Sequence, residues 1–235
     1  MLEAFKHEVC EANRRLADEN LATLNWGAVS GYDKHTDTVA IMPAGVAHED
    51  VKPQDIVLVD LDGDIIEGRL EPCRDTPTHC LIYKAFHHAG VYGVCHMFSP
   101  YATMYAQARM PIPCMGMTHA DYFYGEVPVT RDLTEAEVAQ SYEADVGRVI
   151  IETFRQNEIN PALTPAVLVA GHAPFAWGPS ADHAVNNAIA LEAVAQMCHG
   201  TTRLNPSAAP LPKYMMDKRH NRKHRSDSPY GQRLL

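Results

Sequence analysis

The chain has 235 residues, 46% hydrophobic and 21% charged, an ordinary composition for a globular protein of 26.0 kDa. Its net charge of −9 argues against nucleic-acid binding, and no apolar run is long enough to span a membrane. Acidic residues interrupt the N-terminus where a signal peptide would be apolar, and six scattered cysteines without a C-x-x-C pair argue against a disulfide framework. We therefore expect a cytoplasmic protein without a membrane or nucleic-acid partner, formed by a single domain over residues 1–235.

Apolar periodicity and helix-start signals divide the chain into interleaved helices and strands. Proline in a first turn marks helix starts at Pro77 and Pro100, and Thr134 with Glu137 forms a capping box. The expected helices are residues 2–17, 76–88, one from 99, one from 134, 180–200, and a short terminal helix after a connector at 205–212. The expected strands lie within 25–32 and at 38–42, 56–61, 65–67, 91–97 and 166–170. Interleaving without a linker indicates one α/β domain, although periodicity leaves the order of the sheet open.

Positive charge is concentrated at the C-terminal end. Residues 213–235 hold seven Lys or Arg against two Asp, a balance of +5, so the remainder of the chain carries −14. A basic segment on an acidic body can bind an anionic ligand or contact a neighbouring subunit, and a solvated terminus is the alternative.

Two histidines each end an apolar, strand-like run of the sequence. His96 follows Val94-Cys95, and His172 follows the run at residues 167–171; Asp75 precedes the first of them in the chain. Two imidazoles and a carboxylate at the ends of short elements could bind a divalent metal and leave coordination positions open. For either histidine, a hydrogen-bonded position in the core is the alternative.

Six segments carry motifs that occur together in one family. They are Trp26-Gly27…Val29-Ser30, Asp75-Thr76-Pro77-Thr78-His79, Ala102-Thr103…Ala106-Gln107, Thr118-His119-Ala120-Asp121-Tyr122-Phe123-Tyr124-Gly125, His172…Pro174-Phe175-Ala176-Trp177-Gly178 and Asp217-Lys218…Tyr230-Gly231-Gln232. Together they resemble the class II aldolase family, and most closely its L-ribulose-5-phosphate 4-epimerase branch. The resemblance implies a three-layer α/β/α domain, usually in a homotetramer with active sites between subunits, to which residues 213–232 would contribute.

The resemblance also implies the chemistry. In this family a divalent metal, commonly zinc, polarises a substrate carbonyl while an acid/base pair assists cleavage of a C–C bond. In the epimerase branch, retro-aldol cleavage is followed by rotation of the aldehyde and re-addition. Cleavage beside a carbonyl leaves an enediolate, whose charge a Lewis-acidic metal stabilises. We expect an isomerase or lyase that uses zinc, with manganese and iron as alternatives, and a small substrate that is anionic as in the family.

The resemblance assigns metal ligands to His96 and His172, and places Asp75 at the family's carboxylate near the metal. The family's second histidine in a His-x-His pair is Phe98 in this chain. On a strand, residues 96 and 98 face the same way, so an aromatic ring takes the place of an imidazole. Asp75 is then a candidate for a full ligand.

The resemblance likewise assigns the proton-transfer residues. Asp121 matches the family's catalytic acid, Tyr230 the tyrosine supplied by a neighbouring subunit, and Glu143 an acidic residue near the site. Thr118 and His119 lie in the same block as Asp121 and are candidate substrate-binding residues. For Glu143, a solvated helix face is the alternative.

Departures from the family pattern cluster where the substrate phosphate would bind. Ala28 replaces an asparagine, Ala44 replaces a serine in the turn that ends at Gly45, and Cys73-Arg74 replaces a pair of serines. Arg219 replaces a histidine. Arg74 and Arg219 are therefore candidate substrate-binding residues, because arginine binds anions in bidentate fashion. Gly45 is a further candidate, because it ends the turn that matches the family's substrate-binding turn. A surface salt bridge is the alternative for Arg74.

Three functions fit this pattern. The first is a family enzyme that performs aldol, epimerase or lyase chemistry on a substrate other than L-ribulose 5-phosphate. The second is a non-haem iron enzyme, in which His96, His172 and Asp75 form a two-histidine, one-carboxylate site. The third is a non-catalytic family member. We favour the first and expect little epimerisation of L-ribulose 5-phosphate, because three hydroxyls and an amide of the phosphate site are lost.

Overall fold

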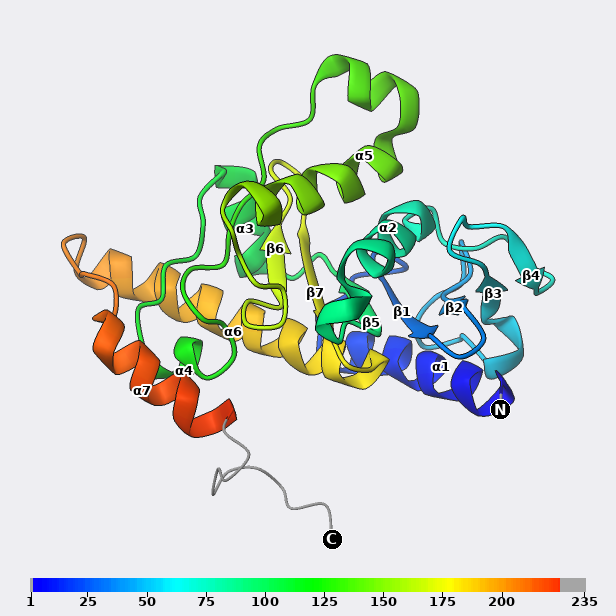
Figure 1. Cartoon of the computed structure of the whole chain (residues 1–235), viewed down its shortest axis with the longest axis horizontal. Helices are drawn as coiled ribbons and strands as arrows, with labels where there is room; N and C mark the ends of the chain where they lie inside the picture. The colour runs from blue at the N-terminus through cyan, green and yellow to red at the C-terminus, as the bar shows by residue number, and fades with distance from the viewer. Residues whose placement is uncertain (1, 225–235) are drawn as a thin grey trace, which may run out of the picture.

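A seven-stranded sheet lies at the centre of the molecule, in the order β4-β3-β2-β1-β5-β7-β6 (Figure 1). This computed structural model describes residues 2–224, and every neighbouring pair of strands in the sheet is antiparallel. The strands are β1 (Ala28–Asp33), β2 (Thr38–Ile41), β3 (Val57–Val59), β4 (Ile65–Glu67), β5 (Gly93–His96), β6 (Ala166–Leu168) and β7 (Pro174–Gly178). The helices are α1 (Leu2–Asp18), α2 (Thr76–Phe86), α3 (Pro100–Ala108), α4 (Met117–Ala120), α5 (Glu135–Gln156), α6 (Ala181–Leu204) and α7 (Lys213–His224).

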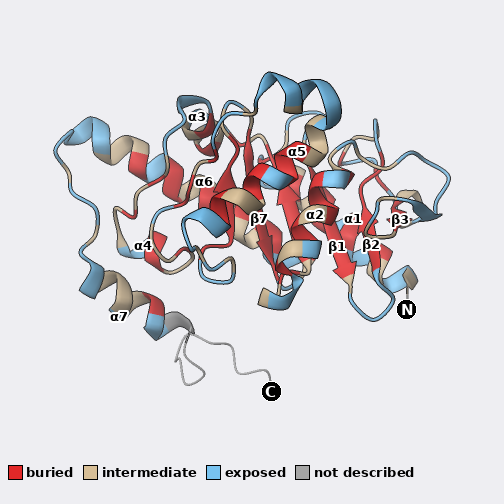
Figure 2. Cartoon of the chain, turned by 45° about the horizontal axis from the view of Figure 1, so that its top comes forward, coloured by how far each residue is buried: buried red, intermediate tan, exposed pale blue. Residues whose placement is uncertain are grey.

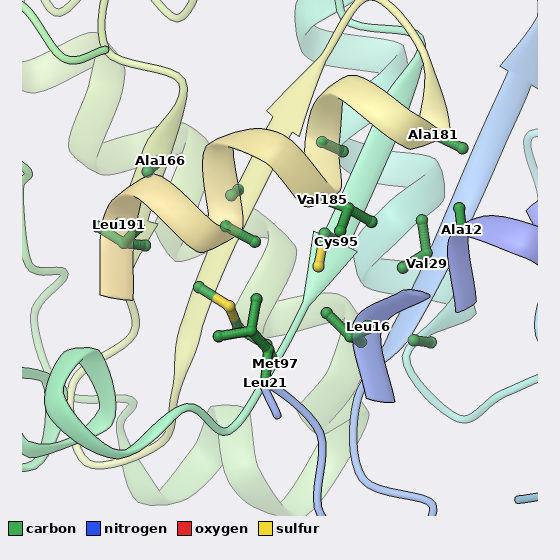
Figure 3. Close-up of a cluster of buried hydrophobic side chains, with 14 of the residues drawn as sticks. Ala12, Leu16, Leu21, Val29, Cys95, Met97, Ala166, Ala181, Val185 and Leu191 are labelled. Atoms are coloured by element: carbon green, nitrogen blue, oxygen red, sulfur yellow. The ribbon is translucent and has the colours of Figure 1, made fainter. Parts of the chain in front are cut away.

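Helices cover both faces of the sheet, which confirms the three-layer α/β/α architecture. Successive side chains of a strand point to opposite faces. In β5, Val94 accordingly joins the apolar cluster that contains Phe154 of α5, whereas Cys95 joins the cluster that contains Leu16 of α1 and Leu191 of α6 (Figure 3). The buried residues concentrate in the sheet and on the inner faces of these helices (Figure 2). Each buried leucine contributes about 1.5–3 kcal/mol relative to an exposed one.

Most of the expected elements are confirmed, with differences at their ends. The helix expected to stop at residue 200 continues through the half-buried Gly200 to Leu204, since one glycine costs a helix only about 1 kcal/mol. The strand expected at 91–97 is shorter, Gly93–His96, and β7 was not expected as a strand at all. No helix among residues 2–224 is long and apolar enough to cross a membrane.

The long helix α5 is bent near its beginning. Ser141 has a non-helical backbone (φ −152°, ψ 56°), and the turns before it project away from the body of the protein (Figure 1). The expected capping box at Thr134 and Glu137 is present. Arg131, which precedes the helix, donates hydrogen bonds from its guanidinium to the carboxylate of Glu137 before the kink and to that of Glu152 after it. This arrangement fixes where the residues that follow Ser141 lie.

Candidate metal and active site

His96 is held from two sides at the end of the central strand β5. Its Nδ1–H donates to Oδ2 of Asp75, the residue immediately before α2, over 3.0 Å. The ring of Phe175 on β7 stacks on the imidazole with centroids 4.2 Å apart and planes 3° apart. The side chain of His96 is 1% exposed, and among the described residues its Nε2 has no hydrogen-bond partner. Proteins hold metal-binding histidines in this way, with the second nitrogen on a carboxylate.

His172 lies in the turn between β6 and β7, close to His96. The two imidazole centroids are 5.0 Å apart, and the Nδ1 of His172 is 3.5 Å from the hydroxyl of Tyr142 on α5. Gly171 just before it has φ +69°, a left-handed conformation that favours glycine and allows this tight turn.

Phe98 occupies the space beside both histidines, as expected for a ring in place of an imidazole. Its centroid is 4.8 Å from that of His96 and 5.5 Å from that of His172. The reason differs from the expected one, because β5 ends at His96 and Phe98 follows in the next loop. The indole of Trp26 packs edge-on against Phe98 with centroids 5.8 Å apart, which closes this side of the cluster.

The pKa values of Asp75 and His172 both lie below their usual values. Burial alone would raise the pKa of Asp75, but the neighbouring imidazoles, that of His96 above all, hold it below its usual value. Burial lowers the pKa of His172 to about 4, so its imidazole is neutral at pH 7. Burial and the charge of Asp75 raise the pKa of Cys73, whose thiol lies 3.6 Å from Oδ2 of Asp75. A neutral imidazole is the form that binds metals.

The residues present fit a metal that two imidazoles hold. The Nε2 atom of His96 is buried and free, and the neutral ring of His172 lies beside it. Within residues 2–224 no group of three or more His, Cys, Asp or Glu side chains has the arrangement of a complete metal site. Asp75 here orients His96 through a hydrogen bond, and its direct ligation stays a prediction.

A buried polar network of Ser30, His79 and Tyr83 packs against Phe175, next to the cluster. The Ser30 hydroxyl on β1 lies 2.7 Å from Nδ1 of His79 and 2.7 Å from the hydroxyl of Tyr83. The His79 ring meets the edge of Phe175, the residue that stacks on His96. Burial lowers the pKa of His79 to about 3, so the network stays uncharged at neutral pH. The network ties α2, which begins just after Asp75, to the middle of the sheet.

A second group of the expected residues lies together at α4 and α7. Asp121 forms a bidentate ion pair with Arg219 of α7, with Nη2–Oδ2 at 2.8 Å and Nε–Oδ1 at 2.7 Å. His119 is buried and its Nε2–H donates to the carbonyl oxygen of Gly125 over 2.8 Å. Burial lowers the pKa of His119 to about 4. Thr118 is exposed on the same short helix.

One chain does not bring these two groups together. Asp121 lines a cavity of about 720 Å³ together with Val91 and Gly178, at the start of β5 and the end of β7. The cluster of Asp75, His96 and His172 lies at the other end of the same strands, where His96 pairs with Phe175. Gly93, which pairs with Gly178, is three residues from His96, or about 10 Å at roughly 3.3 Å per residue.

Of the other expected site residues, Arg74 and Glu143 lie near Asp75. Gly45 is exposed in a turn with φ +74°, and Arg74 is exposed beside Asp75 and forms no salt bridge within the described part of the chain. The carbonyl oxygen of Glu143 accepts a hydrogen bond from the Thr78 hydroxyl, and its carboxylate is near enough to raise the pKa of Cys73. Tyr230 lies outside the described residues.

Sequence reasoning missed two side chains of the cluster, Tyr142 and Phe175. Each had a local signal. Tyr142 directly precedes Glu143, and Phe175 follows His172 by three residues in a motif that was noted for the family but not for the site. Both contact a histidine only through tertiary packing, and the periodicity of apolar residues in the sequence does not predict such contacts.

Comparisons with known proteins show the family of this chain. Residues 7–199 match the family model of the Class II Aldolase and Adducin N-terminal domain. The chain is 44% identical over 232 residues to the L-ribulose-5-phosphate 4-epimerases UlaF of Salmonella paratyphi B (strain ATCC BAA-1250 / SPB7) and Salmonella typhi, covering 99% of this chain and 100% of each relative.

Solved structures share the fold. An L-fuculose 1-phosphate aldolase superposes with a TM-score of 0.72 at 22% identity, over 93% of this chain and 95% of that one. The L-fuculose 1-phosphate aldolase from Glaciozyma antarctica PI12 superposes with a TM-score of 0.73 at 20% identity, over 93% and 81% of the two chains.

Proposed function

Since this chain belongs to the class II aldolase family, we propose that it catalyses metal-dependent cleavage or epimerisation at a C–C bond beside a carbonyl in a small anionic sugar. The observation that carries the proposal is the cluster of Asp75, His96 and His172. It combines an oriented imidazole with a free, buried Nε2 and a second neutral imidazole 5.0 Å away, centroid to centroid. The Nε2 of His79 is also buried without a partner in the described residues, so it is the second imidazole beside the free nitrogen of His96 that indicates a metal site.

In this proposal the residues of the cluster divide the work. His96 and His172 would hold the metal, which when bound supplies Lewis-acid polarisation of the substrate carbonyl. Asp75 keeps its charge and accepts the hydrogen bond from Nδ1–H of His96, so Nε2 is the nitrogen of that ring that could bind the metal. The rings of Phe98 and Phe175 exclude water from the space between the imidazoles.

The proton-transfer residues would come from a second subunit. Asp121, paired with Arg219, lies at the far end of the strands from His96, so a single chain has an incomplete site. We propose a homotetramer in which Asp121 and the segment 213–232 of one subunit face the metal cluster of the next. The carboxylate of Asp121 would then accept or return the substrate proton, with Tyr230 beside it.

Two observations bear on the substrate, and they differ. The identity of 44% to proteins named L-ribulose-5-phosphate 4-epimerase favours that substrate. The replaced residues disfavour it, because Ala28 pairs with His96 in the sheet and Cys73 contacts Asp75, so the changes lie in the site itself. Losing three charge-assisted hydrogen bonds of about 1.5–3 kcal/mol each would weaken phosphate binding by more than about 1,000-fold. We therefore propose a related anionic carbonyl substrate.

Elemental analysis and an activity assay test this function together. Protein purified without chelator or affinity metal should contain about one zinc or manganese per subunit, and His96→Ala should lose it while the exposed His88→Ala retains it. Iron in that analysis would support a non-haem iron enzyme instead, and no metal would support a non-catalytic protein. Turnover of L-ribulose 5-phosphate at about 1–10 per second would make the chain an ordinary epimerase and refute the change of substrate.

A further inference from the structure

Tyr142 lies where the bend of α5 meets the metal cluster. It directly follows Ser141, the residue whose backbone leaves the helix, and its half-buried ring is 5.9 Å from that of His172, centroid to centroid. Its hydroxyl is 3.5 Å from Nδ1 of His172, a long hydrogen bond of the kind that shortens when a site is loaded. An unbroken helix through Ser141 would turn Tyr142 to another direction.

The two histidines are held by matching contacts. His96 meets Asp75 through Nδ1, and His172 meets Tyr142 through Nδ1, so each ring can present Nε2 to the space between them. The partner of a ring's second nitrogen decides which tautomer a metal-binding histidine adopts. Asp75 was expected from the sequence to be near the metal, whereas no role was expected for Tyr142.

We propose that Tyr142 is a positioning residue for His172: its oxygen accepts the Nδ1–H, which fixes the tautomer and turns the unprotonated Nε2 toward His96. The proposal rests on the proposed function, because it concerns the same metal site. Burial and the neighbouring carboxylates of Asp75 and Glu143 raise the pKa of Tyr142, which keeps the hydroxyl neutral. A neutral phenol can accept this hydrogen bond without adding charge to the site.

The test compares Tyr142→Phe with Tyr92→Phe. Phenylalanine keeps the ring and its packing and removes only the hydroxyl. Tyr92 is a matched control, since it is also half-buried but lies before β5, at the end of that strand opposite His96. Thermal unfolding of both variants shows that the fold is retained.

The first readout is zinc affinity, measured by competition with a coloured chelator. Removing the partner of a ligating histidine weakens metal binding by about 10- to 100-fold, so Tyr142→Phe should lose that much and Tyr92→Phe none. Equal zinc affinity of Tyr142→Phe and the unchanged protein would overturn the proposal.

The second readout needs no metal. In metal-free protein labelled with 15N-histidine, the His172 signals, assigned with His172→Asn, should show the Nδ1–H tautomer in the unchanged chain and in Tyr92→Phe. In Tyr142→Phe they should show a mixture of tautomers. An unchanged tautomer in Tyr142→Phe overturns the proposal, whatever happens to zinc. If the unchanged protein binds no zinc but this shift is seen, the role of Tyr142 stands and the metal-dependent function fails.

Discussion

Replacing Phe98 by histidine should strengthen zinc binding about 100-fold. The ring of Phe98 already lies 4.8 Å from that of His96 and 5.5 Å from that of His172, so an imidazole there would adjoin both proposed ligands. Zinc sites with four protein ligands bind with about 10–16 kcal/mol, or roughly 3 kcal/mol for each ligand. At about 1.4 kcal/mol per tenfold, one added ligand corresponds to about two orders of magnitude.

The assay is zinc competition against a chelating dye at neutral pH, with the unchanged protein and Phe98→Leu as references. Leucine removes the aromatic ring without adding a nitrogen. Any gain in zinc affinity that Phe98→Leu shows therefore comes from the space the ring leaves, and a further gain in Phe98→His comes from the added ligand. Phe98→His should bind zinc tighter than both, and Trp26, which packs against residue 98, should report the change in its fluorescence. Equal affinity of Phe98→His and Phe98→Leu would refute the placement of residue 98 at a ligand position.

Three further outcomes are expected. Ser30→Ala should lower the free energy of unfolding by about 2–4 kcal/mol in urea titrations, because His79 and Tyr83 both lose a buried partner; a loss below 1 kcal/mol would contradict the network. Acid should destabilise the fold between pH 6.5 and 4, since burial lowers the pKa of His119 to about 4 and the unfolded chain therefore binds a proton first. His119 contributes up to about 3 kcal/mol to this loss, so His119→Gln should flatten the pH dependence of the unfolding free energy. Sedimentation at micromolar concentration should give a tetramer of the 26.0 kDa chain, and a monomer would contradict the shared site.

The sequence was informative where a local signal decides the structure. The capping box at Thr134 and the proline at residue 77 predicted where α5 and α2 begin, because both signals act within one turn. Alternating or continuous apolar runs predicted six of the strands. β7 has only five residues and opens with Pro174, so its place between β5 and β6 depends on pairing that no local pattern reports.

In the candidate site, too, some residues could be identified from local sequence signals and others could not. His96, His172 and Asp75 could be named because each ends or begins an element, and the structure brings them together. The contact of Tyr142 with His172 depends on a single non-helical residue in α5, which a continuous helical pattern conceals. The ion pair between Asp121 and Arg219 joins residues 98 positions apart, and such pairing follows from the docking of α7.

The bend of α5 connects a surface ion pair to the side chains around His172. Arg131, two-fifths exposed, forms ion pairs with Glu137 on one limb of the bent helix and with Glu152 on the other, so it bridges the two limbs. Tyr142 follows the bend and touches His172, so a substitution at Arg131 would reach the imidazole through the backbone while every pocket residue stayed the same. Dissolved salt screens such surface charges. We therefore expect a substitution at Arg131 to shift Tyr142 relative to His172 without changing any residue of the cluster itself.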